Sequence, residues 1–378
     1  DVLVIGGGPA GASAAISIAL RGHSVVLVEQ RAPSPASQRS WLVNHQANRY
    51  LLSAGVVLDG HAVDSVRFTH RTRVTERPLR SGSAIVIRQD ELFSSMRQRC
   101  RELGVVVHEE TRATSPIIER GFLRGAACDD AREFLAEYSV IADGANSTFG
   151  RALGTYRRRD LPYLVAVNGA WSARSAQDPN ISVDLELVRP DGRPLAGYGW
   201  VIPDGHGAVT AGVVVPSTVR DVESINLQQV LVQMVSSVGH RWGLVADSPL
   251  ELGRERRLPV GGSVGPVLGP TFIVAGDAAS TADPLSGIGV TGAVMSGVLA
   301  GDILATAVDE GASAPLQRYS ADLKAALGRR QQLGRYILPV LGHPAGRYLL
   351  PFATRSRTAA DLLLRSTFDI SLPNPLSQ

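Results

Sequence analysis

The sequence predicts an α/β protein that combines a parallel-sheet domain, an inserted antiparallel-sheet domain and a C-terminal helical tail. Residues 1–28 alternate an apolar run, a glycine turn, a helix-like segment and a second apolar run, the pattern of a buried parallel sheet. Residues 160–258 instead carry β-rich runs divided by Pro/Gly turns. Beyond them, Pro339, Pro344 and Pro351 interrupt the helix-like segments of the tail. A chain of 378 residues is also long for one compact core.

The first domain opens with the apolar run DVLVI, which leads into GGGPAG and matches GxGxxG at Gly6, Gly8 and Gly11. In this motif the first glycine permits a tight turn, the second lets a pyrophosphate approach the backbone, and the third lets the helix pack on the strand. The phosphates lie on the helix N-terminus, and an acidic residue about 20 positions on, here Glu29, accepts hydrogen bonds from a ribose. The sequence therefore predicts a Rossmann-like dinucleotide site.

Two later motifs indicate which dinucleotide binds. The apolar run TFIVA leads into GDAASTADPLSGIGV at residues 276–290, and IADGANS occupies residues 141–147. In this order the three motifs resemble those of the FAD-dependent oxidoreductases built like p-hydroxybenzoate hydroxylase. The resemblance implies FAD, with Asp277 on the ribityl chain and the segment from Pro284 to Gly289 against the isoalloxazine. A helix N-terminus at that point would stabilise a reduced, anionic flavin.

The resemblance also implies roles for an arginine in the loop after Glu29 and for the arginine that opens an R-x-x-(L/F) helix. The expected cofactor-binding residues are Gly6, Gly8, Pro9, Ala10, Gly11, Glu29, Gln30, Arg31, Arg39, Arg88, Asp143, Gly144, Gly276, Asp277, Pro284, Gly287, Ile288 and Gly289. His45, in the same loop, is a candidate general base, although a lone histidine is more often a solvated side chain. No metal-spaced His/Cys cluster occurs, and no metal site is expected.

The motifs and turns predict interleaved domains. The expected FAD-binding domain comprises residues 1–60, 85–158 and 259–330, the substrate-binding β-sheet domain residues 61–84 and 159–258, and the C-terminal helical segment residues 331–378. The Pro- and Ser-rich segment 31–46 reads as a loop. The β-like runs 65–69 and 84–87 read as one hairpin contributed to the second domain.

The motif YGWVIP, residues 198–203, resembles motifs of geranylgeranyl reductases and flavin-dependent halogenases. Halogenases carry a lysine between the glycine motif and this one, whereas the single lysine here, Lys324, lies far beyond it. Halogenation is therefore not expected. Tyr198 and Trp200 share one strand face and are candidate substrate-binding residues; the alternative is that they only pack a sheet core.

These features favour a monooxygenase that hydroxylates or epoxidises an apolar or aromatic substrate through a flavin hydroperoxide. One alternative is a reductase of carbon–carbon double bonds, as in geranylgeranyl reductases. Another is a flavoprotein that modifies residues of a partner protein. The chain has no second supported GxGxxG, so the electron source is expected to be NAD(P)H that binds transiently or a separate flavin reductase.

The composition bears on the protein's partners and on its cellular compartment. The net charge is +3, and no block of like charges suggests a nucleic-acid partner. Cys100 and Cys128 form no CxxC, which favours a reducing cytoplasm. The longest apolar segment, residues 291–308, is rich in Gly and Ala and interrupted by Asp302, which indicates a buried helix rather than a transmembrane span.

Overall fold

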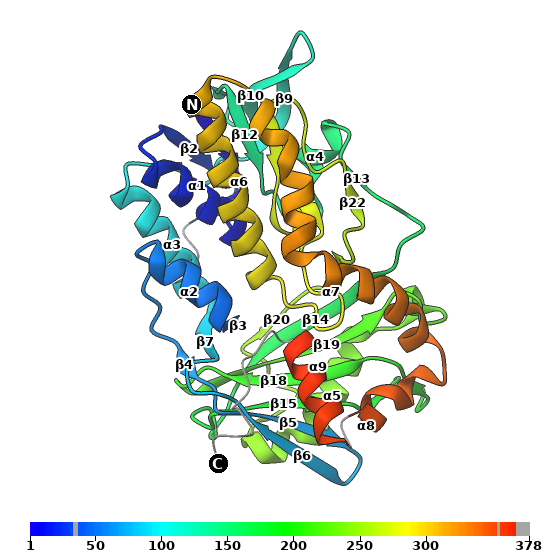
Figure 1. Cartoon of the computed structure of the whole chain (residues 1–378). Coiled ribbons are helices and arrows are strands. Elements are labelled where there is room, and N and C mark those ends of the chain that lie inside the picture. The colour runs from blue at the N-terminus through cyan, green and yellow to red at the C-terminus, as the bar shows by residue number, and fades with distance from the viewer. Residues whose placement is uncertain (33–36, 354–355, 368–378) are drawn as a thin grey trace.

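The computed structural model describes residues 1–32, 37–353 and 356–367. A domain built on a parallel sheet lies above an antiparallel sheet in Figure 1, and the tail helices follow one side of both. This arrangement confirms the α/β fold with an antiparallel-sheet insertion and a helical C-terminal region.

The parallel sheet explains the apolar runs of the first domain. Its strand order is β23 (Phe272–Val274), β12 (Tyr138–Ile141), β1 (Val2–Ile5), β2 (Val25–Val28) and β8 (Val106–His108), all neighbours parallel. Along β1, Val2 and Val4 pack on the helical side, whereas Leu3 and Ile5 pack on the opposite side. Both faces are covered, so every residue of β1 is buried.

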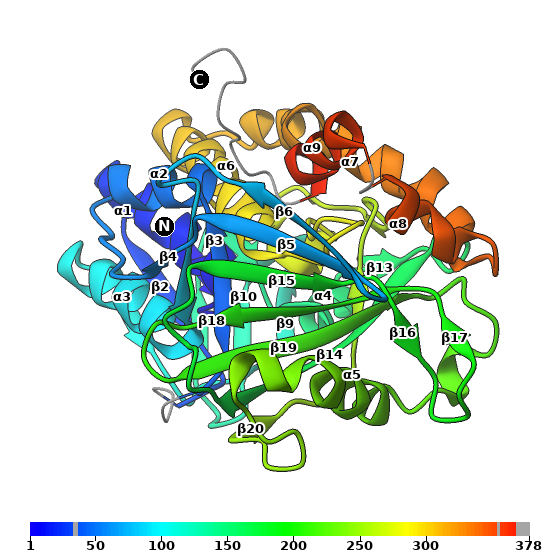
Figure 2. The same cartoon turned by 90° about the horizontal axis from the view of Figure 1, so that it is seen from below.

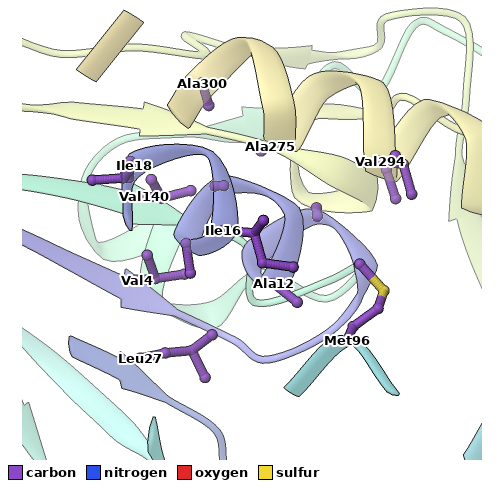
Figure 3. Close-up of a cluster of buried hydrophobic side chains, with 14 of the residues drawn as sticks. Val4, Ala12, Ile16, Ile18, Leu27, Met96, Val140, Ala275, Val294 and Ala300 are labelled. Atoms are coloured by element: carbon purple, nitrogen blue, oxygen red, sulfur yellow. The ribbon is translucent and has the colours of Figure 1, made fainter. Parts of the chain in front are cut away.

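Three helices cover the first face: α1 (Pro9–Leu20), α3 (Gln89–Glu102) and α6 (Val290–Glu310). A small sheet of β9 (Ala113–Glu119), β10 (Phe122–Cys128) and β11 (Glu133–Leu135) covers the other. Figure 3 shows α1 between the sheet and α6, with Ile16 and Val294 in the shared core. α1 and α6 pack very closely, as the glycine at position 297 shows: a Cβ there would lie 2.2 Å from the carbonyl oxygen of Ala10.

α6 is also the one helix of the described residues that is long and apolar enough to cross a membrane, judged by length and composition. However, 72% of that apolar window is buried inside the protein. Its apolar character is therefore accounted for by its place in the core.

The second layer is a twisted sheet seen from below in Figure 2. Its order is β20 (Glu251–Leu252), β14 (Tyr163–Ser172), β19 (Ala208–Pro216), β18 (Tyr198–Pro203), β15 (Asn180–Asp184), β5 (Ser65–His70) and β6 (Arg73–Pro78), with β21 (Arg256–Pro259) also on β14. All neighbours are antiparallel except β15 and β5, which are parallel. α5 (Leu227–Trp242) covers one face. The other face looks toward the parallel-sheet domain.

The predicted hairpin of residues 65–69 and 84–87 is wrong. β5 pairs with β6, whereas β7 (Ala84–Arg88) pairs with β3 (Ser40–Asn44) and β4 (His61–Ala62). β6 reads RVTERP, and its charges suit an exposed edge strand that local pattern mistakes for a turn.

The segment 31–46 is likewise more than a loop. It contains β3, and Asn44 then caps α2 (His45–Ser53) by accepting the Ala47 N–H at 3.0 Å.

The C-terminal helices join the two layers. α7 (Tyr319–Gly342) runs from the parallel-sheet domain to the antiparallel sheet (Figure 1), and Pro339 lies inside its last turn instead of ending it. η4 (Gly346–Tyr348), α8 (Leu349–Ala353) and α9 (Arg357–Thr367) follow, and the final residues, SLPNPLSQ, lie outside the described residues. Short elements elsewhere are α4 (Thr148–Ala152), β13 (Tyr156–Arg157), β16 (Leu187–Val188), β17 (Pro194–Leu195), η1 (Val222–Ser224), β22 (Val264–Gly265), η2 (Gly276–Ala279) and η3 (Ala314–Arg318).

Asp184, at the end of β15, makes the stability of the sheet depend on pH. Burial raises the pKa of its carboxyl from 3.8 to about 6, although Oδ1 accepts the Glu186 N–H at 2.9 Å. The folded state therefore binds this proton more tightly than the unfolded chain does. The stability contributed by the protonated carboxyl is present below the unfolded pKa and is lost as pH rises through the folded one.

We expect Asp184→Asn, which keeps the acceptor oxygen, to change stability little near pH 4 and to raise it by about 2–3 kcal/mol near pH 8. Urea unfolding across this range measures the difference from the parent protein. Asp160→Asn is the control, because the pKa of that exposed carboxyl is lowered by its hydrogen bond to Arg158. An equal gain at both pH values, or the same gain in the control, would contradict the assignment.

Candidate functional site

A cavity lies where the two sheets meet. Its parallel-sheet side is formed by the turn before α1, by β3 and by the segment before α6, and its other side by β14, β18, β19 and β21. The three sequence motifs therefore converge on one place, although they are separated by more than a hundred residues.

The glycine turn has the geometry that the motif predicts. Gly6 has φ of +103°, and a Cβ there would lie 2.3 Å from the Ala142 oxygen. A Cβ at Gly11 would lie 1.9 Å from the Gly6 oxygen, so the helix can pack on the strand only through glycine. Gly8, by contrast, lines the cavity and has nothing within 4 Å of a Cβ position. The backbone of Gly8, Pro9 and Ala10 is thus accessible to a ligand at the N-terminus of α1, which has no side-chain cap.

Glu29 fixes this turn from the next strand. Its carboxylate accepts the Gly7 N–H at 2.6 Å and the Arg31 N–H at 2.9 Å. The side chain is buried, while Gln30 and Arg31 are exposed, and none of these three residues lines the cavity in the described structure.

In the GD motif, a carboxylate oxygen of Asp277 indicates what kind of ligand the cavity binds. Asp277 lines the cavity beside Gly276, and burial raises the pKa of its carboxyl, an effect that the charge of Arg256 opposes. Its Oδ1 is shielded from water and has no hydrogen-bond partner in the protein. A buried carboxylate oxygen without a donor is costly, and the hydroxyl groups of a ribityl chain are the kind of donor that would satisfy it. The residues present therefore fit FAD.

The segment after Asp277 leads to the second helix N-terminus at the cavity. Gly287, Ile288 and Gly289 line it, whereas Pro284 packs outward, 2.2 Å from where a Cβ of Gly334 on α7 would lie. α6 begins after Gly289 with no side-chain cap and no acidic residue in its first turn. The positive end of this helix is thus directed to the cavity, as the motif predicts.

The two residues of the Asp-Gly motif lie in different places: the glycine lines the cavity and the aspartate does not. Gly144, at φ of +82°, lines the cavity. Asp143 does not line it; its Oδ2 accepts the Phe149 N–H at 2.9 Å in the first turn of α4. Burial raises the pKa of the Asp143 carboxyl. The aspartate of this motif therefore holds the local turn.

Of the predicted arginines, Arg39 lines the cavity and Arg88 does not. Arg39 lines the cavity, with Nε 2.6 Å from Glu251 and Nη1 3.2 Å from Asn168. Arg88 instead pairs with Asp90 at 2.9 Å, and that hydrogen bond raises its pKa. Its neighbour Gln89 lines the cavity in its place.

His45 is exposed at the start of α2, outside the cavity lining, which gives it no contact with a ligand there. Within residues 1–32, 37–353 and 356–367, no group of three or more His, Cys, Asp or Glu could hold a metal ion.

The sequence did not indicate two further arginines at the cavity, Arg254 just before β21 and Arg256 at its start. Arg254 and Arg256 line the cavity, and burial together with the charges of Arg39 and Arg31 lowers the pKa of Arg256. The alternation in RERR was the available signal, because Arg257 points away and pairs with Glu223 at 3.0 Å. Trp41 and Leu42 of β3 were missed as well, since that strand was expected to be a loop.

β18 forms the apolar wall. Tyr198, Trp200 and Ile202 face the cavity, while Gly199 and Val201 face α5, so the predicted alternation is correct. The rings of Tyr198 and Trp200 are 6.3 Å apart, and Trp200 lies directly over Gly212 of β19. The Tyr198 hydroxyl donates to the Ser286 oxygen at 2.8 Å. The same residues thus pack against the sheet core and line the cavity.

Sequence comparisons with known proteins identify the same kind of cofactor-binding domain. Residues 1–192 match the FAD binding domain family. The chain is 30% identical over 317 residues to a menaquinone reductase of Mycolicibacterium smegmatis, covering 80% of this chain and 76% of the relative. It is 26% identical over 355 residues to a digeranylgeranylglycerophospholipid reductase of Thermoplasma acidophilum, covering 87% and 84%.

Among solved structures, a geranylgeranyl bacteriochlorophyll reductase-like protein of Thermoplasma acidophilum superposes with a TM-score of 0.80 at 20% identity, covering 98% of this chain and 96% of that one. A flavin-dependent brominase superposes with a TM-score of 0.74 at 18% identity, covering 97% and 92%. These two show the fold. The chain belongs to the FAD-dependent oxidoreductases of the p-hydroxybenzoate hydroxylase-like superfamily.

The unpartnered oxygen of Asp277 gives a test of the cofactor site. We expect Asp277→Ala to cost about 1–3 kcal/mol of FAD affinity, roughly a tenfold to hundredfold rise in Kd. The FAD-free protein should melt at a higher temperature, because a buried carboxylate with a raised pKa is removed. Fluorescence titration and thermal melting measure the two effects. The exposed Asp160→Ala is the control and should change neither; unchanged FAD affinity in Asp277→Ala would place this residue outside the site.

Proposed function

We propose that the protein reduces a carbon–carbon double bond in the isoprenoid chain of a quinone or lipid. The menaquinone and digeranylgeranylglycerophospholipid reductases among its relatives support this proposal. The observation that carries it is the division of the cavity into a cationic end and an apolar wall.

The cationic end lies beside the glycine turn and the α6 N-terminus. Arg254 and Arg256 reach it from the antiparallel-sheet side, whereas Arg39, just before β3, and two uncapped helix ends reach it from the other. This end suits the phosphates and the ring of FAD.

The wall is suited to a different kind of molecule. Tyr198, Trp200 and Ile202 are joined there by Ile181, Val214 and Leu258 from neighbouring strands. Such a surface offers broad apolar contact and few polar anchors, which favours a flat alkene or polyene segment. An isoprenoid chain has that shape and chemistry.

Reduction of the double bond adds a hydride to one carbon and a proton to the other. Reduced FAD, held by the glycine turn, Asp277 and the N-terminus of α6, would supply the hydride and its two electrons, and solvent water would supply the proton. The apolar wall would hold the alkene in place. Among the described lining residues, Tyr198 and Asp277 alone can carry an acidic proton. The pKa of Tyr198 is strongly raised by burial, and its O–H is directed to the Ser286 oxygen, so Tyr198 positions the segment before α6.

The second candidate is the monooxygenase favoured by the sequence, since the same wall would hold an aromatic substrate. The names of the relatives favour reduction over oxygenation. Both reactions need reducing equivalents, and we propose NAD(P)H that binds transiently or a separate reductase as their source.

One experiment separates the two reactions. The FAD-loaded protein, reduced chemically without oxygen, is mixed with menaquinone that carries an unsaturated side chain, or with a digeranylgeranyl phospholipid. We expect the product to keep two extra hydrogen atoms in its isoprenoid chain, located by fragment mass spectrometry after any quinol has been reoxidised in air. A product that gains one oxygen atom, and only after oxygen is admitted, would identify a monooxygenase. If neither substrate changes mass while the flavin is still reoxidised by oxygen, isoprenoid reduction is excluded.

Trp200 tests whether the wall contacts the substrate. We expect Trp200→Phe to leave FAD content and melting temperature nearly normal and to raise KM severalfold, because a smaller ring leaves part of the wall uncovered. Trp242→Phe is the matched control, since Trp242, the last residue of α5, is fully buried on the sheet face away from the cavity and should affect stability alone. Lower stability with normal kinetics in Trp200→Phe would assign Trp200 to core packing.

A further inference from the structure

The C-terminal helices expose an unusual number of large apolar side chains. Six of the twenty exposed large apolar side chains in the described residues fall within positions 333–352. We name them the tail face: Leu333, Tyr336, Val340, Tyr348, Leu349 and Phe352. Such density within one short segment marks an interaction surface.

The tail face is the outer side of a helix whose inner side covers the cavity wall. Gly334 packs against Pro284, and Leu338 is buried in the cluster that contains Tyr198. Leu333, Tyr336 and Val340 lie at helical spacing on the opposite side of α7, and Tyr336 is 77% exposed. α7 is therefore apolar on two sides, and the buried side alone is explained by the fold.

The tail face continues from α7 onto α8 without a break. Val340 and Leu349 line one shallow hollow together with Pro339, His343, Ala345 and Gly346. Phe352, one turn beyond Leu349, is 70% exposed. Figure 2 shows α7 and α8 along the same edge of the molecule.

Charge is distributed just as unevenly. By sequence, residues 323–378 hold eight of the 38 lysines and arginines and two of the 35 acidic residues, a net charge of +6. The remaining residues carry a net charge of −3. Lys324, Arg329 and Arg365 are exposed on α7 and α9. An apolar surface with aromatic residues inside a basic segment is the combination that binds anionic lipid headgroups and inserts below them.

We propose that the tail face docks the protein on the surface of an anionic phospholipid bilayer. A symmetric dimer through the same face would bring two +6 segments together, which disfavours a second copy as the partner. The proposal extends the proposed function, because an isoprenoid quinone or lipid resides in the bilayer and α7 separates the tail face from the cavity wall. The surface itself is identified without reference to that activity.

The test compares vesicles of phosphatidylcholine alone with vesicles that also contain phosphatidylglycerol. We expect the FAD-loaded protein to sediment with the anionic vesicles and to be released by high salt. Tyr336→Ser with Phe352→Ser should weaken this binding by about tenfold or more. Tyr156→Ser with Leu135→Ser is the matched control; these side chains are 62% and 70% exposed on the parallel-sheet domain and should not matter.

Three results would overturn the proposal. The first is a parent protein that stays in solution with both kinds of vesicle. The second is equal binding by the parent and the Tyr336/Phe352 variant. The third is a dimer in vesicle-free solution that this variant converts to a monomer, which would assign the tail face to a second copy.

A dispersed short-chain isoprenoid separates the docking proposal from the proposed function. The variant should reduce it as fast as the parent protein. If neither protein reduced it while vesicle binding stood, the proposed function would fail and the docking surface would remain. If the variant alone lost this activity, the tail face would serve the cavity instead of a bilayer, against the docking proposal.

Discussion

The close packing of α1 on α6 is the constraint on which the rest of the structure depends. Glycines permit it, since a Cβ at Gly297 or Gly301 would lie 2.2 or 2.7 Å from carbonyl oxygens of α1. Because both helices start at the cavity, this contact brings two uncapped N-termini to one place. The two helices begin 281 residues apart, at Pro9 and Val290, so the chain must return to the glycine turn after it has formed the inserted sheet. That geometry makes a single anion-binding region out of two distant motifs.

Charged groups at the cavity destabilise the folded protein when no cofactor is bound. Desolvation and the charges of Arg39 and Arg31 lower the pKa of Arg256, and Asp277 has one buried carboxylate oxygen without a hydrogen-bond partner. Each charge destabilises the empty arrangement, and a bound pyrophosphate and ribityl chain would satisfy both kinds of group. Cofactor binding and stability are therefore coupled, since what binds the folded state alone stabilises it.

Local steric rules made much of the site predictable from sequence. The roles of Gly6, Gly8 and Gly11 follow from backbone contacts within one turn, and the alternation of Tyr198 and Trp200 follows from strand geometry. The pairing of distant strands could not be predicted from the sequence. β5 pairs in parallel with β15 across 115 residues, and no local pattern encodes that register. The candidate at Arg88 also depended on side-chain direction, because its partner Asp90 holds it aside and Gln89 faces the cavity.

The bond from Tyr198 to Ser286 joins the two domains at the point where both meet the cavity. It ties β18 to the segment before α6, where Asp283 accepts the N–H groups of Leu285 and Ser286 at 3.0 and 2.7 Å. Tyr198 and Trp200 thus have separate tasks within one motif: the tyrosine positions the cofactor segment, and the tryptophan shapes the wall. A tryptophan at position 198 would present its N–H from a wider ring and could not donate to the same carbonyl oxygen unless β18 or the segment before α6 moved. The tyrosine therefore fixes the spacing between β18 and the segment before α6, two elements that line the cavity.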